Sequence, residues 1–547
     1  MRKRWSLAVL TAAGLAVQMA LCSAVSAYPH PGGVHSAKQL TSAKRNIAGG
    51  SQPWVDGRNE LIPRAEFYLS EPPSAVTDFN VPGYYEDPAG HTRASEVLQN
   101  DVRAAYTLAL AYQLTGKTAY AEKAKSFLAN WAGKNTRISG TDGPLVMTYS
   151  GVGLIHAAEL LRDYSGWNIA DKIAFETWLT GVYLAKAANA IKTESNNWGD
   201  WGIYGAMSAY YYKDDNVQLN AEIIRLKNKI ESSIAADGSM PQEAGRGVSG
   251  LWYTYFALAP ITSAAHIAKE AAGIDLFHWT SPGGTTIKQA LDYLLYYMNH
   301  PDQWPYGENP RMPGSSEDWG YNLFEAMSDY YDEPSYKDFA SAREPIMYLS
   351  SHFAWNLLSV TKGGLRLTEE NFDSYTSTAA PYSWTVSKSA NTSAVVWNIP
   401  TATDKSLKIW DMNAAGTAAA TKVFPDQYGI VEAEWKFMYT ALFPSAKFGL
   451  KGAGAYAAEL LTTPSGLVYR SSTGSDIVLQ GLSPNTWYSV KLIANPFAGK
   501  VDIYVNGVLK ASGVTFHSAV SFLDRIEFAG AWGETGTLYI DQVNITN

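Results

Sequence analysis

The stretch SEVLQNDVRAAYTLALAYQLTGKTAYAEKAKSFLANWAG, residues 95–133, indicates the fold class of the first part of the chain. Its apolar side chains recur every three or four residues, a spacing that predicts two amphipathic helices. Gly116 lies between them and predicts the turn, because glycine readily ends a helix. The first apolar stripe is Val102, Ala105, Tyr106, Ala109 and Leu110, and the second is Tyr120, Ala124, Phe127, Leu128 and Trp131. The stretch is therefore predicted to be a helical hairpin.

Similar helical patterns, joined by short turns, continue from about residue 94 to residue 360. Two of them share a signature: DWGIYGAMSAYY begins at Asp200, and DWGYNLFEAMSDYY begins at Asp318. The DWG, AMS and tyrosine pairs match, although the spacing differs by two residues. Repeated helical hairpins of this length most often close into a solenoid or an α/α toroid.

After roughly residue 370 the pattern changes to alternation of apolar and polar residues, as in KVFPDQYGIVEAEWKFMY, and this indicates β-strands. Asn506-Gly507 stands between two such runs and predicts a two-residue hairpin turn. We therefore expect a helical domain over residues 28–365 and an antiparallel β-sandwich over residues 370–547. A chain of 547 residues is long enough for two or more domains.

The first 27 residues have the composition of a secretory signal peptide. A basic head, Arg2-Lys3-Arg4, precedes an apolar run that ends in the small residues Val25-Ser26-Ala27, so cleavage is expected after Ala27. A lipoprotein anchor at Cys22 is disfavoured because the bulky Leu21 precedes it. No later stretch is long and apolar enough to span a bilayer. The mature protein is predicted to be secreted, to the periplasm or the medium, with no membrane attachment.

Cysteine usage and charge narrow the functional classes. Cys22 is the only cysteine and lies in the predicted signal, so the mature chain offers neither disulfides nor thiol chemistry. Removing the three basic residues of the signal changes the formal net charge from −8 to −11, which disfavours a nucleic-acid partner. A polyanionic sugar remains compatible, because a basic cleft can lie in an acidic protein. The motifs typical of metal, phosphate and dinucleotide sites are missing from the sequence, so no cofactor is predicted.

The stretch TESNNWGDWG, residues 193–202, places two asparagines beside two tryptophans at the expected start of a helix. Asn196 and Asn197 could simply cap that helix, and Trp198 and Trp201 could simply fill a core. The same residue types also suit a carboxylated sugar, because amides donate hydrogen bonds to a carboxylate and flat rings wall a sugar subsite.

A second cluster occurs in DGSMPQEAGRGVSGLWYTYFAL, residues 237–258. Arg246 and Tyr253 stand seven residues apart, about two turns if the stretch is helical. An isolated pair of this kind is usually a surface arginine and a core tyrosine. Glu243 is expected to be a partner of Arg246 or a solvated acid.

Together these segments resemble a known family. The segment VPGYYEDPAGHTRASEVLQNDVRAAYTLALAYQLTGKTAYAEKAKSFLANW, the NNW run and the Arg246/Tyr253 spacing are similar to the alginate lyase superfamily over roughly residues 50–360. The resemblance implies an α/α toroid, an incomplete barrel of helical hairpins, in a polysaccharide lyase that acts on a polyuronate. It also implies functional roles for Tyr253, Arg246 and Asn197. The β half resembles concanavalin-like or laminin-G-like sandwiches, which implies either sugar binding or a purely structural role.

The chemistry of a uronate lyase explains these residue types. The reaction removes the proton at C5, next to a carboxylate, and expels the oxygen at C4. Negative charge builds on the carboxylate as the enolate forms, and amide or guanidinium donors such as Asn197 and Arg246 stabilise it. Asn196 would orient Asn197. Tyr253 could move the proton, and an adjacent arginine would lower its pKa.

The sequence departs from the family at one position. Alginate lyases of this type carry histidine directly after the asparagine pair, where this chain has Trp198. Either Tyr253 acts as both base and acid in a syn elimination, which suits β-mannuronate or β-glucuronate, or another histidine such as His156 or His91 is the base.

A loop before the first hairpin and two other functional classes complete the expectations. Tyr84 and Tyr85 lie in a loop with proline and glycine, of the kind that closes over a sugar chain. An α/α-toroid glycoside hydrolase is one alternative, with Asp200, Glu243 and Asp318 as candidate carboxylates. A non-catalytic glycan-binding protein is the other, and the missing histidine favours it.

Overall fold

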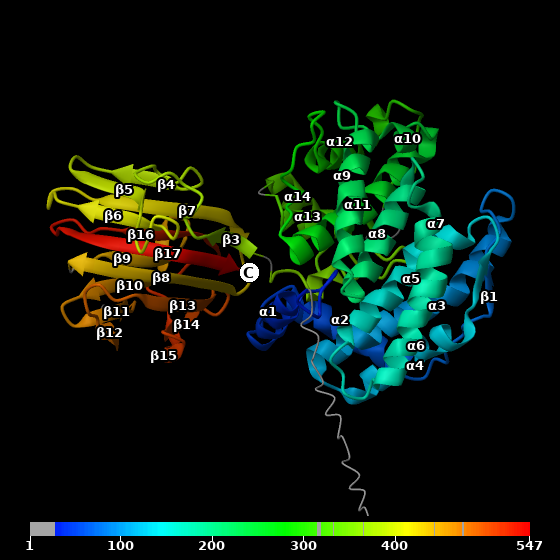
Figure 1. Ribbon diagram of the computed structural model, residues 1–547, viewed down its shortest axis with the longest axis horizontal. Helices are drawn as coiled ribbons and strands as arrows, with labels where there is room; N and C mark the ends of the chain where they lie inside the picture. Colours follow the sequence, from blue (N-terminus) through cyan, green and yellow to red (C-terminus); the bar gives the residue numbers. More distant parts are fainter. Residues whose placement is uncertain (1–27, 314–318, 332, 365, 442–443, 473–474) are drawn as a thin grey trace, which may run out of the picture.

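The computed structural model describes residues 28–547, except 314–318, 332, 365, 442–443 and 473–474. The predicted signal peptide, residues 1–27, and Asp318 therefore lie outside the described residues. Figure 1 shows a helical body formed by the first part of the chain and a β body formed by the last part. The predicted order of an α/α toroid and then an antiparallel β-sandwich is confirmed.

The helical body is built from helices of very different lengths. They are α1 (Ala37–Ala48), α2 (Trp54–Tyr68), α3 (Pro88–Thr115), α4 (Thr118–Lys134), α5 (Gly143–Leu160), α6 (Ile169–Trp178), η1 (Leu179–Ala188), α7 (Asn189–Ile191), α8 (Asn197–Tyr212), α9 (Asn216–Ser233), α10 (Pro241–Ala244), η2 (Gly247–Ser249), α11 (Gly250–Ala272), α12 (Ile287–Asn299), η3 (Pro301–Gln303), α13 (Trp319–Ser328), α14 (Pro334–Ser341) and η4 (Leu358–Val360). Two short parallel strands, β1 (Asp78–Asn80) and β2 (Arg137–Ser139), join the loops at one end.

The hairpin predicted from residues 95–133 is formed by α3 and α4. Gly116 ends α3 in the left-handed conformation, with φ of 72°, and its N–H donates to the carbonyl of Tyr112. Tyr106 on α3 and Tyr120 on α4 are buried, as the apolar stripes predicted.

The inner wall of the toroid consists of α3, α5, α8 and α11, each of which contacts the next, while α4, η1, α9 and α12 pack outside them. Contacts at their first turns show that these inner helices begin at the same end. The N–H of Tyr84, just before α3, donates to Asp142 at the start of α5, and Asn197 at the start of α8 bonds to Glu243, just before α11. Helix N-termini carry partial positive charge, so this end of the toroid attracts anions.

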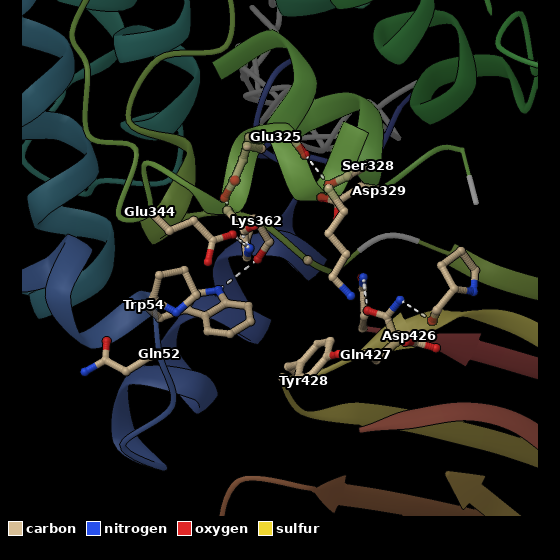
Figure 2. Close-up of a pocket in the computed structure, with 18 of the residues that line it drawn as sticks. Gln52, Trp54, Glu325, Ser328, Asp329, Glu344, Lys362, Asp426, Gln427 and Tyr428 are labelled. Carbon is tan, nitrogen blue, oxygen red and sulfur yellow. Dashed lines mark hydrogen bonds and ion pairs between the residues drawn. The ribbon is translucent and has the colours of Figure 1, made fainter. Parts of the chain in front are cut away.

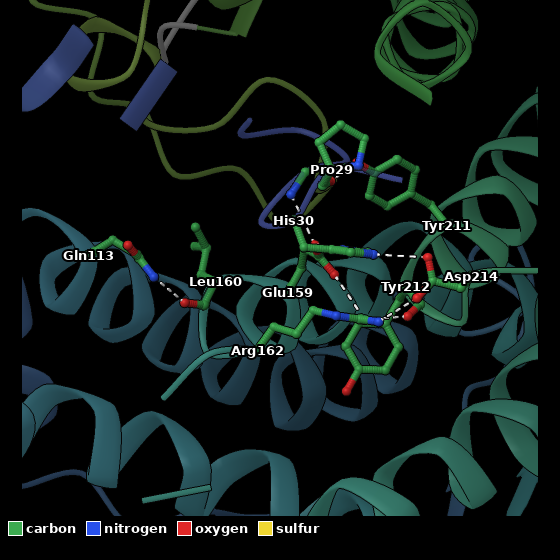
Figure 3. A network of polar contacts seen from close by, with 10 residues as sticks. Pro29, His30, Gln113, Glu159, Leu160, Arg162, Tyr211, Tyr212 and Asp214 are labelled. Carbon is green, nitrogen blue, oxygen red and sulfur yellow. Dashed lines mark hydrogen bonds and ion pairs between the residues drawn. The ribbon is translucent and has the colours of Figure 1, made fainter. Parts of the chain in front are cut away.

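The opposite end is covered by the segment that follows the predicted signal, as Figure 3 shows. His30 bonds to Glu159 near the end of α5 and lies 3.1 Å from Asp214, which follows α8. Asp214 also pairs with Arg162 at 2.7 Å. The hydroxyl of Tyr211 donates to the carbonyl of Pro29. These contacts join the N-terminal segment to the C-terminal ends of two inner helices.

The β body is a sandwich of two antiparallel sheets. Its strands are β3 (Arg366–Glu370), β4 (Thr385–Lys388), β5 (Thr392–Trp397), β6 (Ser406–Asp411), β7 (Ala418–Gln427), β8 (Val431–Ala441), β9 (Lys447–Gly452), β10 (Ala455–Thr463), β11 (Gly466–Arg470), β12 (Asp476–Gln480), β13 (Tyr488–Asn495), β14 (Lys500–Val505), β15 (Val508–Thr515), β16 (Leu523–Ala529) and β17 (Gly536–Thr546). One sheet has the order β12-β11-β10-β9-β16-β7-β4, and the other β15-β14-β13-β8-β17-β6-β5, with β3 beside β17.

The turn predicted at Asn506-Gly507 joins β14 to β15. Both residues have positive φ, 51° and 74°, which is the conformation that a tight two-residue hairpin requires. Alternate residues such as Val501, Ile503 and Val505 face the sandwich core.

The two bodies meet along α1 and the β7–β8 turn. Arg45 pairs with Glu432 at 2.5 Å, and the side-chain oxygen of Asn46 accepts from the N–H of Ile430 at 2.9 Å. Among the described helices, none is both long and apolar enough to cross a membrane.

Candidate active site

Asn196 and Asn197 take different positions at the start of α8. Asn196 is the helix cap, because its side-chain oxygen accepts from the N–H of Trp198 at 3.1 Å. Asn197 is only 1% exposed, and its backbone N–H and side-chain Nδ2 both donate to Glu243, at 2.6 and 2.8 Å. An amide nitrogen carries two hydrogens, so one N–H of Asn197 remains beyond the bond to Glu243. As the cap, Asn196 holds the first turn of α8, which begins with Asn197.

The turn before α8 is held by Lys229, which comes from α9. Its ammonium donates to the carbonyls of Glu194, Ser195 and Asn196, at 3.0, 2.6 and 3.0 Å. Gly199 allows the same turn to approach the helix, since a methyl group there would lie 2.0 Å from the carbonyl oxygen of Glu194. The asparagine pair is thus positioned by contacts that leave little freedom.

Glu243 connects Asn197 to Arg246. It is 1% exposed, and its Oε2 lies 3.4 Å from Nε of Arg246 as well as accepting from Asn197. Burial raises the pKa of Glu243, while its bonds to Asn197 and the charge of Arg246 lower it. The sequence suggested Glu243 as a partner of Arg246, as a solvated acid or as a hydrolase carboxylate, and the structure shows the pair with Arg246. Its bond to Asn197 spans 46 residues and has no sequence signature.

Tyr253 lies in the first turn of α11, where Arg246 contacts its ring and Tyr85 its hydroxyl. The guanidinium carbon of Arg246 lies 4.3 Å from the ring centroid, in a cation–π arrangement. The hydroxyl lies 2.7 Å from that of Tyr85, which is 78% exposed on the loop before α3. The structure therefore brings Asn197, Arg246 and Tyr253 to one end of the toroid, with Tyr85 above them.

The loop that carries Tyr84 and Tyr85 is fastened at its base. Asp142 accepts from the N–H of Tyr84 at 2.8 Å and lies 3.1 Å from Nδ1 of His91. The hydrogen bond to Asp142 raises the pKa of His91. The ring of His91 meets that of Tyr84 edge-on at 5.4 Å. His91 thus supports the tyrosine loop.

The protonation of Tyr253 differs from the expectation. Burial raises its pKa above the ordinary value for tyrosine, and the hydroxyl of Tyr85 raises it further. Arg246 lowers the pKa, as expected, but by less than burial raises it. Tyr253 therefore carries its proton at neutral pH when no ligand is bound.

Two residues expected at the site are buried elsewhere. Trp201 is 0% exposed and packs against Tyr149 and Phe256, so its predicted place in the wall of a sugar subsite is wrong. His156 is 4% exposed, lies 2.8 Å from the hydroxyl of Tyr204, and has its pKa lowered to about 3 by burial. Its predicted place at the site, as an alternative base, is therefore also wrong. Trp198 is half-buried beside Asn197 and stays available to a ligand.

A different histidine, His352, lies near the site. Its ring is 4.8 Å from Phe256 and 6.0 Å from Trp252, the residue before Tyr253. Burial lowers its pKa to about 3, so it is neutral at physiological pH. His352 lies 99 positions from Tyr253, in a segment without helical or strand pattern, so no local motif pointed to it.

The carboxylates that a hydrolase would need do not face a ligand. Asp200 is buried 3.6 Å from Lys229, and burial raises its pKa to about 8. Glu243 is occupied by Asn197 and Arg246, and Asp318 lies outside the described residues. Among the described residues, no cluster of three or more histidine, cysteine or acidic side chains is arranged to hold a metal ion.

A cavity of about 720 Å³ lies away from this site, between the toroid and the sandwich. Figure 2 shows Trp54, Glu325, Glu344 and Lys362 on its toroid side and Tyr428 on its sandwich side. Six acidic side chains and two lysines line it. This excess of negative charge disfavours an anionic ligand there, whereas helix N-termini and arginine favour one beside Tyr253.

The helical domain is a toroid of helical hairpins whose polar end is arranged for an anion. A family model described as "Alginate lyase" matches residues 40–304, so the resemblance inferred from the sequence is confirmed for the helical domain.

Relatives agree with this match. A polysaccharide lyase of Stenotrophomonas maltophilia (strain K279a) is 27% identical over 216 residues, which cover 36% of this chain and 64% of that protein. The aligned region thus spans less than two thirds of the length of that relative.

One solved structure agrees on the fold, and a second is reported for its similarity alone. Alginate lyase A1-III from Sphingomonas species A1 is 18% identical, with a TM-score of 0.50, and the match covers 62% of this chain and 97% of that one. An alginate lyase from Bacteroides ovatus is 20% identical, with a TM-score of 0.47, and covers 58% and 96%.

Proposed function

We propose that this protein is a secreted polysaccharide lyase that cleaves a polyuronate by β-elimination. The observation that carries the proposal is the convergence of Asn197, Arg246 and Tyr253 at the N-terminal ends of the inner helices. The match to the alginate lyase family supports it, and so does a relative described as a polysaccharide lyase.

Asn197 and Arg246 serve the carboxylate of the sugar that loses its C5 proton. As the enolate forms, charge grows on that carboxylate, and donors fixed in advance stabilise it by a few kcal/mol each. Glu243 holds both donors in place. The partial charges of nearby helix N-termini act in the same direction.

Tyr253 handles the proton in a syn elimination. Its deprotonated oxygen takes the C5 proton, and the resulting hydroxyl gives that proton to the departing C4 oxygen, which restores the starting form. A bound sugar that moves Tyr85 aside removes one contribution that raises the pKa of Tyr253, while Arg246 continues to lower it. The competing candidate base is the neutral imidazole of His352, whose ring centroid lies 6.0 Å from that of Trp252.

This geometry sets the expected substrate. In β-mannuronate and β-glucuronate the C5 proton and the C4 oxygen lie on one face of the ring, whereas guluronate needs groups on opposite faces. We therefore propose poly-mannuronate alginate or glucuronan as the substrate. Trp198, Tyr84 and Tyr85 would contact the sugars, and the β-sandwich would bind the polymer or act as a structural domain.

An assay on a panel of polyuronates tests the proposal. Ultraviolet absorbance reports the unsaturated sugar that elimination creates, and a reducing-end assay reports every cleavage. A lyase raises both signals. A rise in reducing ends alone would show a hydrolase, and no change in either would show a binding protein. N-terminal sequencing of exported protein tests the signal peptide, with Tyr28 expected as the first residue.

A further inference from the structure

Trp252 and Tyr253 are consecutive residues, and the guanidinium group of an arginine lies over the ring of each. Arg246 lies over Tyr253, and the guanidinium carbon of Arg311 lies 4.1 Å from the ring centroid of Trp252. The rings of Trp252 and Tyr253 are 5.0 Å apart and nearly perpendicular, at 88°. The two guanidinium groups therefore lie over neighbouring rings whose planes are nearly perpendicular.

The backbone fixes Arg311 close to Tyr253. The N–H of Arg311 donates to the carbonyl of Val248 at 2.7 Å, and Val248 belongs to the short helix η2 that leads directly into α11. Trp304, from the same loop as Arg311, donates its indole N–H to the carbonyl of Gly247 at 3.0 Å. Two bonds thus fasten this loop to the turn before Tyr253, independently of the arginine side chain.

Among the described residues, Arg311 pairs with no acidic side chain. Arg246 has Glu243, but within the part of the chain that the structure describes, no carboxylate lies within 4.0 Å of the Arg311 guanidinium. Arg311 is exposed, and its charge lies near enough to Tyr253 and His352 to lower the pKa of both. A guanidinium stacked flat on a ring keeps its N–H edge free for a planar anion.

We propose that Arg311, oriented by Trp252, forms a second carboxylate subsite, which binds the uronate next to the one that is cleaved. The proposal rests on the proposed function, because it assumes a polyuronate in the cleft. Its consequence is specificity for polymers with consecutive uronates. Chains in which a uronate alternates with a neutral sugar place no carboxylate at Arg311 and are bound more weakly.

Arg311→Gln removes the charge and the fork but keeps a polar side chain. Arg343→Gln is the matched control, because Arg343 is also exposed and lies 5.2 Å over the ring of Tyr321, on α13. With a uniform polyuronate, Arg311→Gln is expected to raise KM by about tenfold or more, with the main loss in KM and not in kcat. Its KM should also depend less on salt. Arg343→Gln should leave KM unchanged.

The substrate comparison separates a binding subsite from a merely structural stack. Arg311→Gln should reduce the preference for a uniform polyuronate over an alternating uronate polymer, while its melting temperature changes no more than that of Arg343→Gln. An unchanged KM and an unchanged preference would overturn the proposal. So would a loss of activity that follows only a loss of stability.

The failure of the proposed function is distinguishable from the failure of this subsite. If the wild type produces no unsaturated sugar from any polyuronate, the lyase function fails. Calorimetric titration with poly-mannuronate then tests the subsite directly. Weaker binding by Arg311→Gln than by Arg343→Gln would support the subsite, and equal binding would contradict it.

Discussion

Glu243 contacts two residues of the candidate site, because it accepts hydrogen bonds from Asn197 and pairs with Arg246. Glu243→Gln keeps the shape but turns an acceptor into a donor, which opposes one of these contacts. We expect kcat to fall by about 10²-fold, because both donors to the developing anion lose their alignment. The measurement is steady-state kinetics on the preferred polyuronate.

Glu222→Gln provides the control for burying an amide in place of a carboxylate. Glu222 is as buried as Glu243 but pairs with Lys192 and Arg225 on the outside of the toroid. This variant should lose stability and keep its kcat. Equal activity losses in the two variants would show that Glu243 acts through folding alone.

The pKa of Tyr253 predicts an alkaline rise in activity. Because burial and Tyr85 raise that pKa, only a small fraction of Tyr253 is deprotonated at neutral pH, and kcat/KM should increase as pH rises. Tyr85→Phe removes a contribution that raises the pKa, so the increase should begin at lower pH. A pH profile of kcat/KM measures both effects. A profile that falls above neutral pH, or one unmoved by Tyr85→Phe, would contradict the role of Tyr253 as base.

The sequence predicted some residues of the candidate site and misplaced others, for a physical reason. Asn197, Arg246 and Tyr253 were found because they lie in short local motifs. Trp201 and His156 were misplaced because α5 and α8 are inner helices that are buried on nearly all sides, so periodicity cannot show which residues face a ligand. Arg311 and His352 were missed because only tertiary packing brings them to the cleft.

The elements themselves were easier to predict than their contacts. The α3–α4 hairpin and the β14–β15 turn follow from local glycine and asparagine positions, and the structure has both. The sandwich begins at Arg366, slightly before the predicted residue 370, because β3 pairs with the C-terminal end of β17. Such a pairing, across nearly the whole β half, leaves no local trace.

The start of α8 depends on glycine at position 199. In Gly199→Ala the new methyl group would meet the carbonyl of Glu194 at 2.0 Å, so the turn must shift. We expect a loss of about 1–3 kcal/mol in the free energy of unfolding, with reduced kcat because Asn197 moves. Gly181→Ala is the control, since nothing lies within 4 Å of its added methyl group on η1. Chemical denaturation measures both, and equal stability of the two variants would contradict the close approach.

The covering of the far end of the toroid predicts a pH-dependent stability. Burial lowers the pKa of His30, but its bonds to Glu159 and Asp214 raise it by more, so the net pKa is raised. The protonated form therefore favours the folded state. This contribution is complete below about pH 6.5, the ordinary histidine value, and is lost as pH rises through the raised pKa.

The variant His30→Gln isolates this effect. Melting temperatures of wild type and variant, measured from pH 5 to pH 9, should differ most at the acid end and converge as pH rises. A difference that is constant with pH would mean that His30 contributes packing alone. A difference that grows with pH would mean that protonation of His30 destabilises the fold, which contradicts the prediction.

Across the whole molecule, the proposed chemistry lies at one end of the toroid, away from the acidic cavity beside the sandwich. The most direct test is the initial rate of absorbance increase with block-defined poly-mannuronate and poly-guluronate, for wild type and Tyr253→Phe. The phenylalanine variant loses only the hydroxyl and should remain folded. We expect wild-type cleavage of mannuronate blocks, and a fall in rate of about 10²–10⁴-fold in Tyr253→Phe. Strong cleavage of guluronate blocks, or near-normal activity of Tyr253→Phe, would contradict it and make a histidine such as His352 the base.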